Sequence, residues 1–272
     1  MSMTDRKQSP PTTEHPHSEP LPPAQHQAGQ WSIRNASLTA GVALLLMTVV
    51  AIFGNIVVID GMVTEGNAGQ TASDIVASQG LFRLGIISLI LVVVLDVVVA
   101  WALYRVFAPV NASLSILATA MRLVYSGVFM VAIGQLVGVV RLLSDEGNGA
   151  VFGVDQVQAQ AMVDIAAFND IWYVGQALFG AHLLLIGFLA YKSGYIPKLV
   201  GALLVIAGTG YVMDSFGAVI SEGSWTDISA FTFLGEFLLA VWLVSRSGRI
   251  GVSAAALEAR SRAPRPLDVA TA

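Results

Sequence analysis

Three ionisable side chains interrupt long apolar runs in this sequence: Asp96, Arg122 and Glu236. Each lies nine or ten residues from the polar end of its run. At 1.5 Å per helical residue, all three lie roughly 14 to 15 Å from one membrane boundary, near the middle of a bilayer. A charge at that depth costs about 2.5 to 3.5 kcal/mol on insertion scales, so each should face the interior of a helical bundle. We therefore expect an intramembrane polar cluster in which Arg122 pairs with Glu236 or Asp96.

Such a cluster fits two kinds of function, and the sequence leaves both open. A buried ion pair would fix which helices are neighbours, as a structural lock. Two acids beside one base also leave a spare carboxylate, and in a low-dielectric site this group could take up and release a proton, as proton-coupled transporters require.

Other polar residues are candidates for the same site. Tyr125 and Ser126 lie within about one helical turn of Arg122 and are expected to join its cluster. His182 and Asp214 are secondary candidates. We expect His182 to be a hydrogen-bonded packing residue, and Asp214, near the end of its apolar run, to be a solvated interfacial acid.

The composition places the chain in a membrane. Of its 272 residues, 55% are hydrophobic and only 12% are charged, whereas soluble domains carry charge on about a quarter of their residues. Mean hydropathy is +0.72. The net charge of -4 hides a segregation of charge between loops and says little about partners, and no basic run suggests nucleic acid. The absence of cysteine excludes disulfides and thiolate metal sites.

Six apolar runs are long enough to span a bilayer. They are Leu38 to Ile59, Leu84 to Phe107, Leu114 to Val140, Trp172 to Tyr191, Leu199 to Ile220 and Ser229 to Ser245. The expected fold is an all-α polytopic membrane bundle of six transmembrane helices in three hairpins. It occupies residues 36–248, between disordered polar tails at 1–35 and 249–272.

The charges of the connecting segments predict the orientation. Basic residues gather before the first run, in the turn around Lys192 and Lys198, and after the last run, whereas the opposite loops are mostly acidic. By the positive-inside rule, both termini are cytoplasmic in a plasma (inner) membrane. On the outer side, Val157, Ala161 and Ile165 recur at helical spacing, which predicts a surface helix over 154–168 at the membrane interface.

Three stretches of the chain resemble a known family. They are FGAHLLLIGFLAYKSGYIPKLVGALLVIAGTGYVMDSF, from Phe179 to Phe216, RLVYSGVF around Arg122, and FTFLGEFLLAVWLVSRSG around Glu236. Together they are similar to the bacterial multi-pass membrane proteins grouped as domain of unknown function 4386, over roughly Ala36 to Gly248. The resemblance implies a compact membrane bundle with an arginine and a glutamate at Arg122 and Glu236, and it implies no activity.

The leading functional hypothesis is a structural, regulatory or accessory membrane protein with an internal lock between Arg122 and Glu236. The alternative is a small proton-coupled transporter or permease, with Asp96 or Glu236 as the proton carrier. The sequence contains no nucleotide-binding glycine loop, no HExxH motif and no convincing serine–histidine pair, so we expect no enzyme, no metal site and no cofactor. The expected partner is the lipid bilayer.

Overall fold

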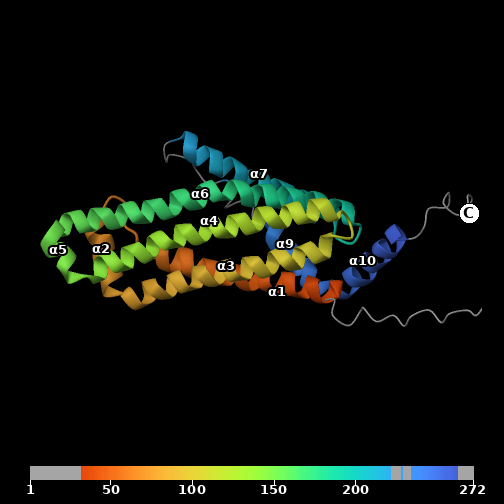
Figure 1. The fold of residues 1–272 in the computed structure, drawn as a ribbon, viewed down its shortest axis with the longest axis horizontal. Helices are drawn as coiled ribbons and strands as arrows, with labels where there is room; N and C mark the ends of the chain where they lie inside the picture. The colour runs from red at the N-terminus through yellow and green to blue at the C-terminus, as the bar shows by residue number, and fades with distance from the viewer. Residues whose placement is uncertain (1–31, 222–227, 229–233, 263–272) are drawn as a thin grey trace, which may run out of the picture. The chain divides into compact units, whose positions relative to one another are not determined.

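A computed structural model describes residues 32–221, 228 and 234–262 (Figure 1). These residues form helices and contain no strand. In chain order the elements are α1 (Ile33–Ala51), the π-helical segment η1 (Ile52–Asp60) that continues it, α2 (Ala68–Ala77), α3 (Gln79–Phe107), α4 (Ala112–Ser144), α5 (Glu146–Phe152), α6 (Val154–Ser193), α7 (Lys198–Ile220), α9 (Leu234–Ser245) and α10 (Ser247–Arg262).

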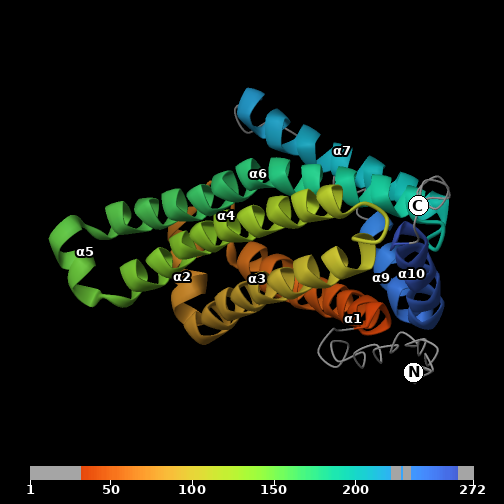
Figure 2. The same ribbon diagram turned by 45° about the vertical axis from the view of Figure 1, so that its right-hand side comes forward.

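Six of these helices pack in a closed ring in the order α1, α3, α4, α6, α7 and α9. Each of these six helices packs on the next one in this order, and α9 packs on α1 to close the ring. Figures 1 and 2 show the antiparallel course of α3, α4 and α6. The predicted all-α bundle of hairpins is therefore confirmed.

The membrane-spanning helices agree with five of the six predicted runs. The continuous helix Ile33–Asp60 and the helices α3, α4, α6 and α7 are each long and apolar enough to cross a bilayer. The α9 and α10 helices pass this test only as a pair, and their axes are bent by 87°. Residues 229–233, the start of the predicted sixth run, lie outside the described residues.

The turn between α6 and α7 is fixed by its side chains. Gly194 ends α6 in the left-handed conformation, with φ of 74°, which favours glycine. The Ser193 hydroxyl donates to the Ala190 carbonyl at 2.7 Å and accepts the Ile196 N–H at 3.2 Å. The Tyr195 hydroxyl donates to the carbonyl of Val106, near the end of α3, at 2.6 Å. The turn thus holds α3 against the α6–α7 hairpin.

Replacing Tyr195 by phenylalanine should destabilise the protein by about 1 to 2 kcal/mol, because the carbonyl of the fully buried Val106 loses its donor. Burial raises the pKa of the Tyr195 hydroxyl, so it remains a donor throughout the neutral range. The measurement is thermal unfolding in detergent. Tyr191→Phe is the matched control, since Tyr191 is 46% exposed. Equal effects of the two substitutions would contradict the role of the turn.

The α4–α6 hairpin extends beyond the length that a membrane requires. With 40 residues, α6 is about 60 Å long, twice the thickness of a hydrocarbon core. Figures 1 and 2 show α4 and α6 running side by side to α5. The prediction of a separate surface helix over 154–168 is wrong: Val157, Ala161 and Ile165 are buried within this continuous helix, on which α2 and α4 pack.

Two predicted boundaries also change. Helix α1 begins at Ile33, so the last residues of the predicted tail 1–35 are helical, and residues 1–31 lie outside the described part. The predicted disordered tail 249–272 is wrong up to residue 262, because α10 packs on α1 and buries Ile250 and Ala254 completely. Residues 263–272 are not described.

Candidate functional site

Asp96 of α3 and Arg122 of α4 form an ion pair inside the helical ring. The Arg122 Nη2 atom lies 2.5 Å from Asp96 Oδ1, and Nε lies 2.9 Å from the same oxygen. The two side chains are 2% and 1% exposed, respectively. Residue counting predicted that Asp96 and Arg122 lie at the same depth on neighbouring helices, and the two side chains are in contact. Of the two partners predicted for Arg122, the structure pairs it with Asp96.

Ser126 completes the coordination of the carboxylate. Its hydroxyl lies 3.2 Å from Asp96 Oδ2 and 2.9 Å from the carbonyl oxygen of Arg122. A serine has one hydroxyl proton, so it donates to one of these acceptors at a time. Both oxygens of Asp96 thus have a donor within reach, which offsets part of the cost of burying the charge.

His182 of α6 belongs to the same cluster, although the sequence predicted only a packing role for it. Its Nδ1 lies 2.8 Å from the carbonyl oxygen of Ala118, which can only accept, so Nδ1 carries the proton. The Nε2 atom is then the acceptor for Arg122 Nη1 at 3.2 Å. His182 is therefore a neutral imidazole that joins the backbone of α4 to the guanidinium.

Less polar groups enclose the guanidinium on its remaining sides. The Phe179 ring of α6 lies 5.1 Å from the Arg122 Cζ atom, in cation–π range. The Met47 sulfur of α1 lies 3.9 Å from Nη2. Tyr125 packs on Phe179 with ring centroids 4.8 Å apart, and its hydroxyl accepts from the Trp172 indole N–H at 3.0 Å.

The sequence alone does not point to these enclosing residues. Phe179 and Met47 are ordinary apolar side chains, and nothing in their type separates them from the rest of the core. Trp172 is the first residue of a predicted apolar run, a position typical of aromatic residues at a membrane boundary. Phe179 and His182 are three residues apart and so share a helical face, which is the one signal that could have linked them.

Glu236 of α9 lies beside the ion pair without joining it. Its carboxylate lies within electrostatic range of Arg122 and Asp96, and Tyr211 of α7 is among the groups around it. Glu236 is only partly buried. Among the described residues, the ion pair of Arg122 is with Asp96, so the predicted direct lock between Arg122 and Glu236 is wrong.

Asp214 differs from its prediction. The expected solvated acid is fully buried, at 0% exposure, and its Oδ1 accepts the backbone N–H of Ile228 at 2.8 Å. The next residue, Ser215, lies with its hydroxyl 3.4 Å from the Val174 carbonyl of α6. Asp214 therefore holds part of the connection after α7 against the bundle, about one helical turn along α7 from Tyr211.

The site as a whole offers hydrogen bonds, one buried ion pair and a second carboxylate nearby. Within the described ranges, no group of three or more His, Asp or Glu side chains is arranged to hold a metal ion. The chemistry that these side chains support is charge pairing between Asp96 and Arg122, with Glu236 as a carboxylate outside that pair.

Comparison with known proteins places the chain in a family. Residues 39–247 match the family described as "Domain of unknown function (DUF4386)". The chain belongs to this family. In the DUF4386 protein described here, the matched region runs from within α1 to the first residue of α10, and it contains every residue of the polar cluster. The resemblance seen in the sequence is confirmed.

The chain also resembles an archaeal protein. An "Uncharacterized protein" of Archaeoglobus fulgidus is 36% identical over 165 residues, which cover 61% of this chain and 85% of the relative. No solved structure matches. This relative of the DUF4386 protein is archaeal, whereas sequence analysis had associated the family with bacteria.

Proposed function

We propose that this DUF4386 protein is a structural, regulatory or accessory membrane protein whose polar cluster locks its helical ring in one arrangement. The observation that carries the proposal is the set of contacts around Arg122. From α4, this side chain contacts Met47 on α1, Asp96 on α3 and both Phe179 and His182 on α6. One charge thereby joins four helices of the ring.

The guanidinium nitrogens of Arg122 already have partners within the protein, so few of its N–H groups are open to a ligand. Its Nε, Nη1 and Nη2 atoms all have partners within the chain, and both carboxylate oxygens of Asp96 have a donor within reach. An anion-binding arginine would instead present free N–H groups to a cavity. A self-satisfied cluster at 1 to 2% exposure favours a lock over a binding site.

Cysteine accessibility tests the proposal directly, because the chain contains no native cysteine. Ser126→Cys places a thiol beside Asp96, while Ser73→Cys and Ala112→Cys place exposed thiols toward the two ends of the bundle. A membrane-impermeant maleimide should label both controls, each from its own side, and should leave Ser126→Cys unlabelled from either side. Labelling of Ser126→Cys in folded protein would show an aqueous path and contradict the lock.

Proton-coupled transport is a second candidate, favoured by one observation: Glu236 is a partly buried carboxylate within electrostatic range of Arg122, and it forms no ion pair with any residue that the structure describes. A carboxylate of this kind is the usual proton carrier of membrane transporters.

Substitution of Glu236 by glutamine tests this second candidate. If the protein moves protons, proteoliposomes containing it should dissipate an imposed pH gradient, and Glu236→Gln should abolish that activity while the protein stays folded. A pH-sensitive dye inside the vesicles gives the measurement. Asp155→Asn removes an exposed acid of α6 and is the matched control. An absence of proton movement in the unsubstituted protein, across a panel of candidate solutes, would count against transport.

The charges of the connecting segments bear on the location of the protein. We propose a plasma (inner) membrane location with both termini cytoplasmic, on the strength of the basic α6–α7 turn and the basic residues that follow α9. The lipid bilayer is the partner. The sequence carries no hydrolytic or nucleotide-binding motif, which supports a non-enzymatic role.

A further inference from the structure

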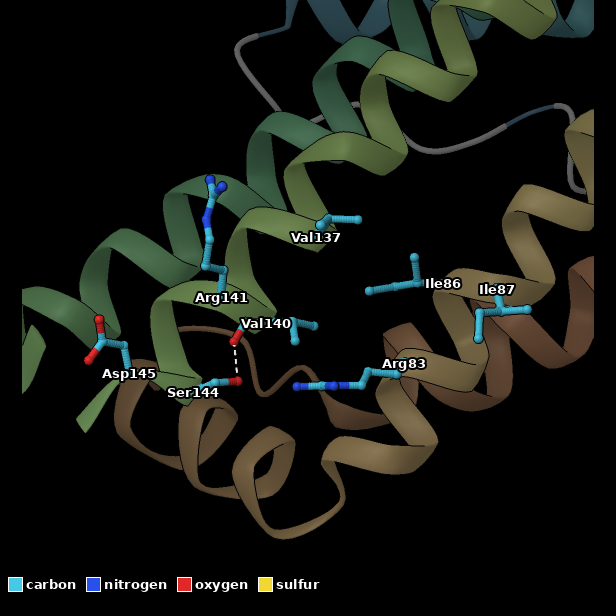
Figure 3. Close-up of a pocket in the computed structure, with 8 residues that line it drawn as sticks. All are labelled: Arg83, Ile86, Ile87, Val137, Val140, Arg141, Ser144 and Asp145. Carbon is cyan, nitrogen blue, oxygen red and sulfur yellow. Dashed lines mark hydrogen bonds between the residues drawn. The ribbon is translucent and has the colours of Figure 1, made fainter. Parts of the chain in front are cut away.

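A groove opens between α3 and α4 at the end of the bundle where α3 begins and α4 ends. It has a volume of about 760 Å³, within the range of small-molecule sites. Its lining is shared between apolar and charged side chains (Figure 3): Arg83, Ile86, Ile87, Val137, Val140, Arg141, Ser144 and Asp145. The groove is separate from the polar cluster, since none of these residues belongs to it.

The apolar and charged residues of the groove are segregated along the helices. Ile86, Ile87 and Val137 lie toward the middle of the bundle, and Ile87 and Val137 are 60% and 49% exposed. Arg83 and Arg141 lie closer to the helix ends. Figure 3 shows Arg83 extending from α3 toward Ser144 of α4, with Arg141 turned away from it on the same rim.

The rim is positively charged on balance. It carries two arginines and one acid, Asp145, whose Oδ1 atom caps α5 by accepting the N–H of Gly147 at 2.9 Å. Arg83 has one contact among the described residues, a 3.3 Å hydrogen bond to the Gln79 amide oxygen. A guanidinium has five N–H groups, so most of the donors of Arg83 remain available to an anion.

The depth of the groove matches the boundary of a bilayer. Arg83 precedes Asp96 by 13 residues of the same helix, which corresponds to about 20 Å. With Asp96 near the middle of a hydrocarbon core about 30 Å thick, Arg83 reaches the level of the lipid headgroups. Ile86 and Ile87 then lie one turn deeper, at the level of the acyl chains.

We propose that this groove binds an anionic phospholipid. The headgroup phosphate pairs with Arg83 while Arg141 adds positive charge to the same rim, and one acyl chain lies against Ile87, deeper on α3. An arginine fork matches the geometry of a phosphate group. The net positive rim disfavours a choline headgroup, whose own cation would face the arginines, so the ligand is an anionic lipid such as phosphatidylglycerol.

Native mass spectrometry of the full chain in detergent tests the proposal. The probes are phosphatidylglycerol and phosphatidylcholine with identical acyl chains. Phosphatidylglycerol should bind more tightly. The double variant Arg83→Gln/Arg141→Gln should lower its affinity at least about tenfold, as expected for lost charge-assisted hydrogen bonds. Lys192→Gln/Arg249→Gln removes two exposed charges elsewhere and is the matched control, with unchanged binding expected.

A second variant tests the apolar part of the groove. Val137→Trp fills it from a half-exposed position, which leaves the core intact, and should weaken both lipids. Equal affinity for the two lipids, or phosphatidylglycerol binding that survives the double arginine variant, would overturn the proposal. Glycerol phosphate that binds as tightly as the intact lipid would make the groove a site for soluble anions and would overturn it as well.

Discussion

Replacing Arg122 by methionine is expected to lower the free energy of unfolding by about 3 to 5 kcal/mol, the usual cost of removing one partner of a buried ion pair. The Asp96 carboxyl group would be left at 2% exposure with only the Ser126 hydroxyl as a donor. His182 would also lose the donor to its Nε2 atom. Asp96→Val should cost a similar amount, because it strands the guanidinium instead.

Thermal and denaturant unfolding in one detergent give the measurement. Arg249→Gln is the matched control, since Arg249 is exposed on α10 and surface substitutions usually change stability by less than about 0.5 kcal/mol. An Arg122→Met variant as stable as Arg249→Gln would mean that the ion pair does not hold the bundle together.

Replacing Gly208 by valine should cost about 3 kcal/mol or more, through a steric conflict between α6 and α7. A Cβ atom at Gly208 would lie 2.7 Å from the carbonyl oxygen of Gly180 and 2.9 Å from the backbone nitrogen of Leu184. Both are backbone atoms of the facing helix, so no side chain can rotate away. The helices would have to separate, and the packing on both sides would be lost.

Gly127→Val is the matched control for this prediction. It adds the same side chain to a glycine in another spanning helix, where a Cβ atom would meet nothing within 4 Å. Unfolding midpoints in detergent, together with the fraction of folded protein on size exclusion, compare the two variants. Comparable losses would indicate that helix propensity dominates, and the close approach of α6 and α7 would then contribute little.

Counting residues along each apolar run was sufficient to find the centre of the site. Depth follows from the fixed rise of a helix, so Asp96 and Arg122 could be placed at one level before any packing was known. The same counting could not choose between Asp96 and Glu236 as the partner. That choice depends on the order of helices in the ring, where α3 adjoins α4 and α9 adjoins α1 and α7.

Other differences arose where hydropathy was used to infer exposure. Asp214 lies near the end of an apolar run, which suggested contact with water, yet the backbone of Ile228 covers it. In α6, hydropathy identified only the half that spans the membrane. The other half is more polar, so the sequence predicted a separate surface helix there. Tertiary packing of α2 and α4 on that extension is not encoded in a hydropathy window.

The double variant Asp96→Val/Arg122→Met tests the central claim most directly. If the pair is a self-contained lock, removing both charges leaves no stranded ion, and the double variant should regain much of the stability that each single variant loses. The coupling between the two substitutions, measured by denaturant unfolding in lipid nanodiscs, should be at least about 2 kcal/mol. Losses that simply add would show that the two charges act independently and would contradict the lock.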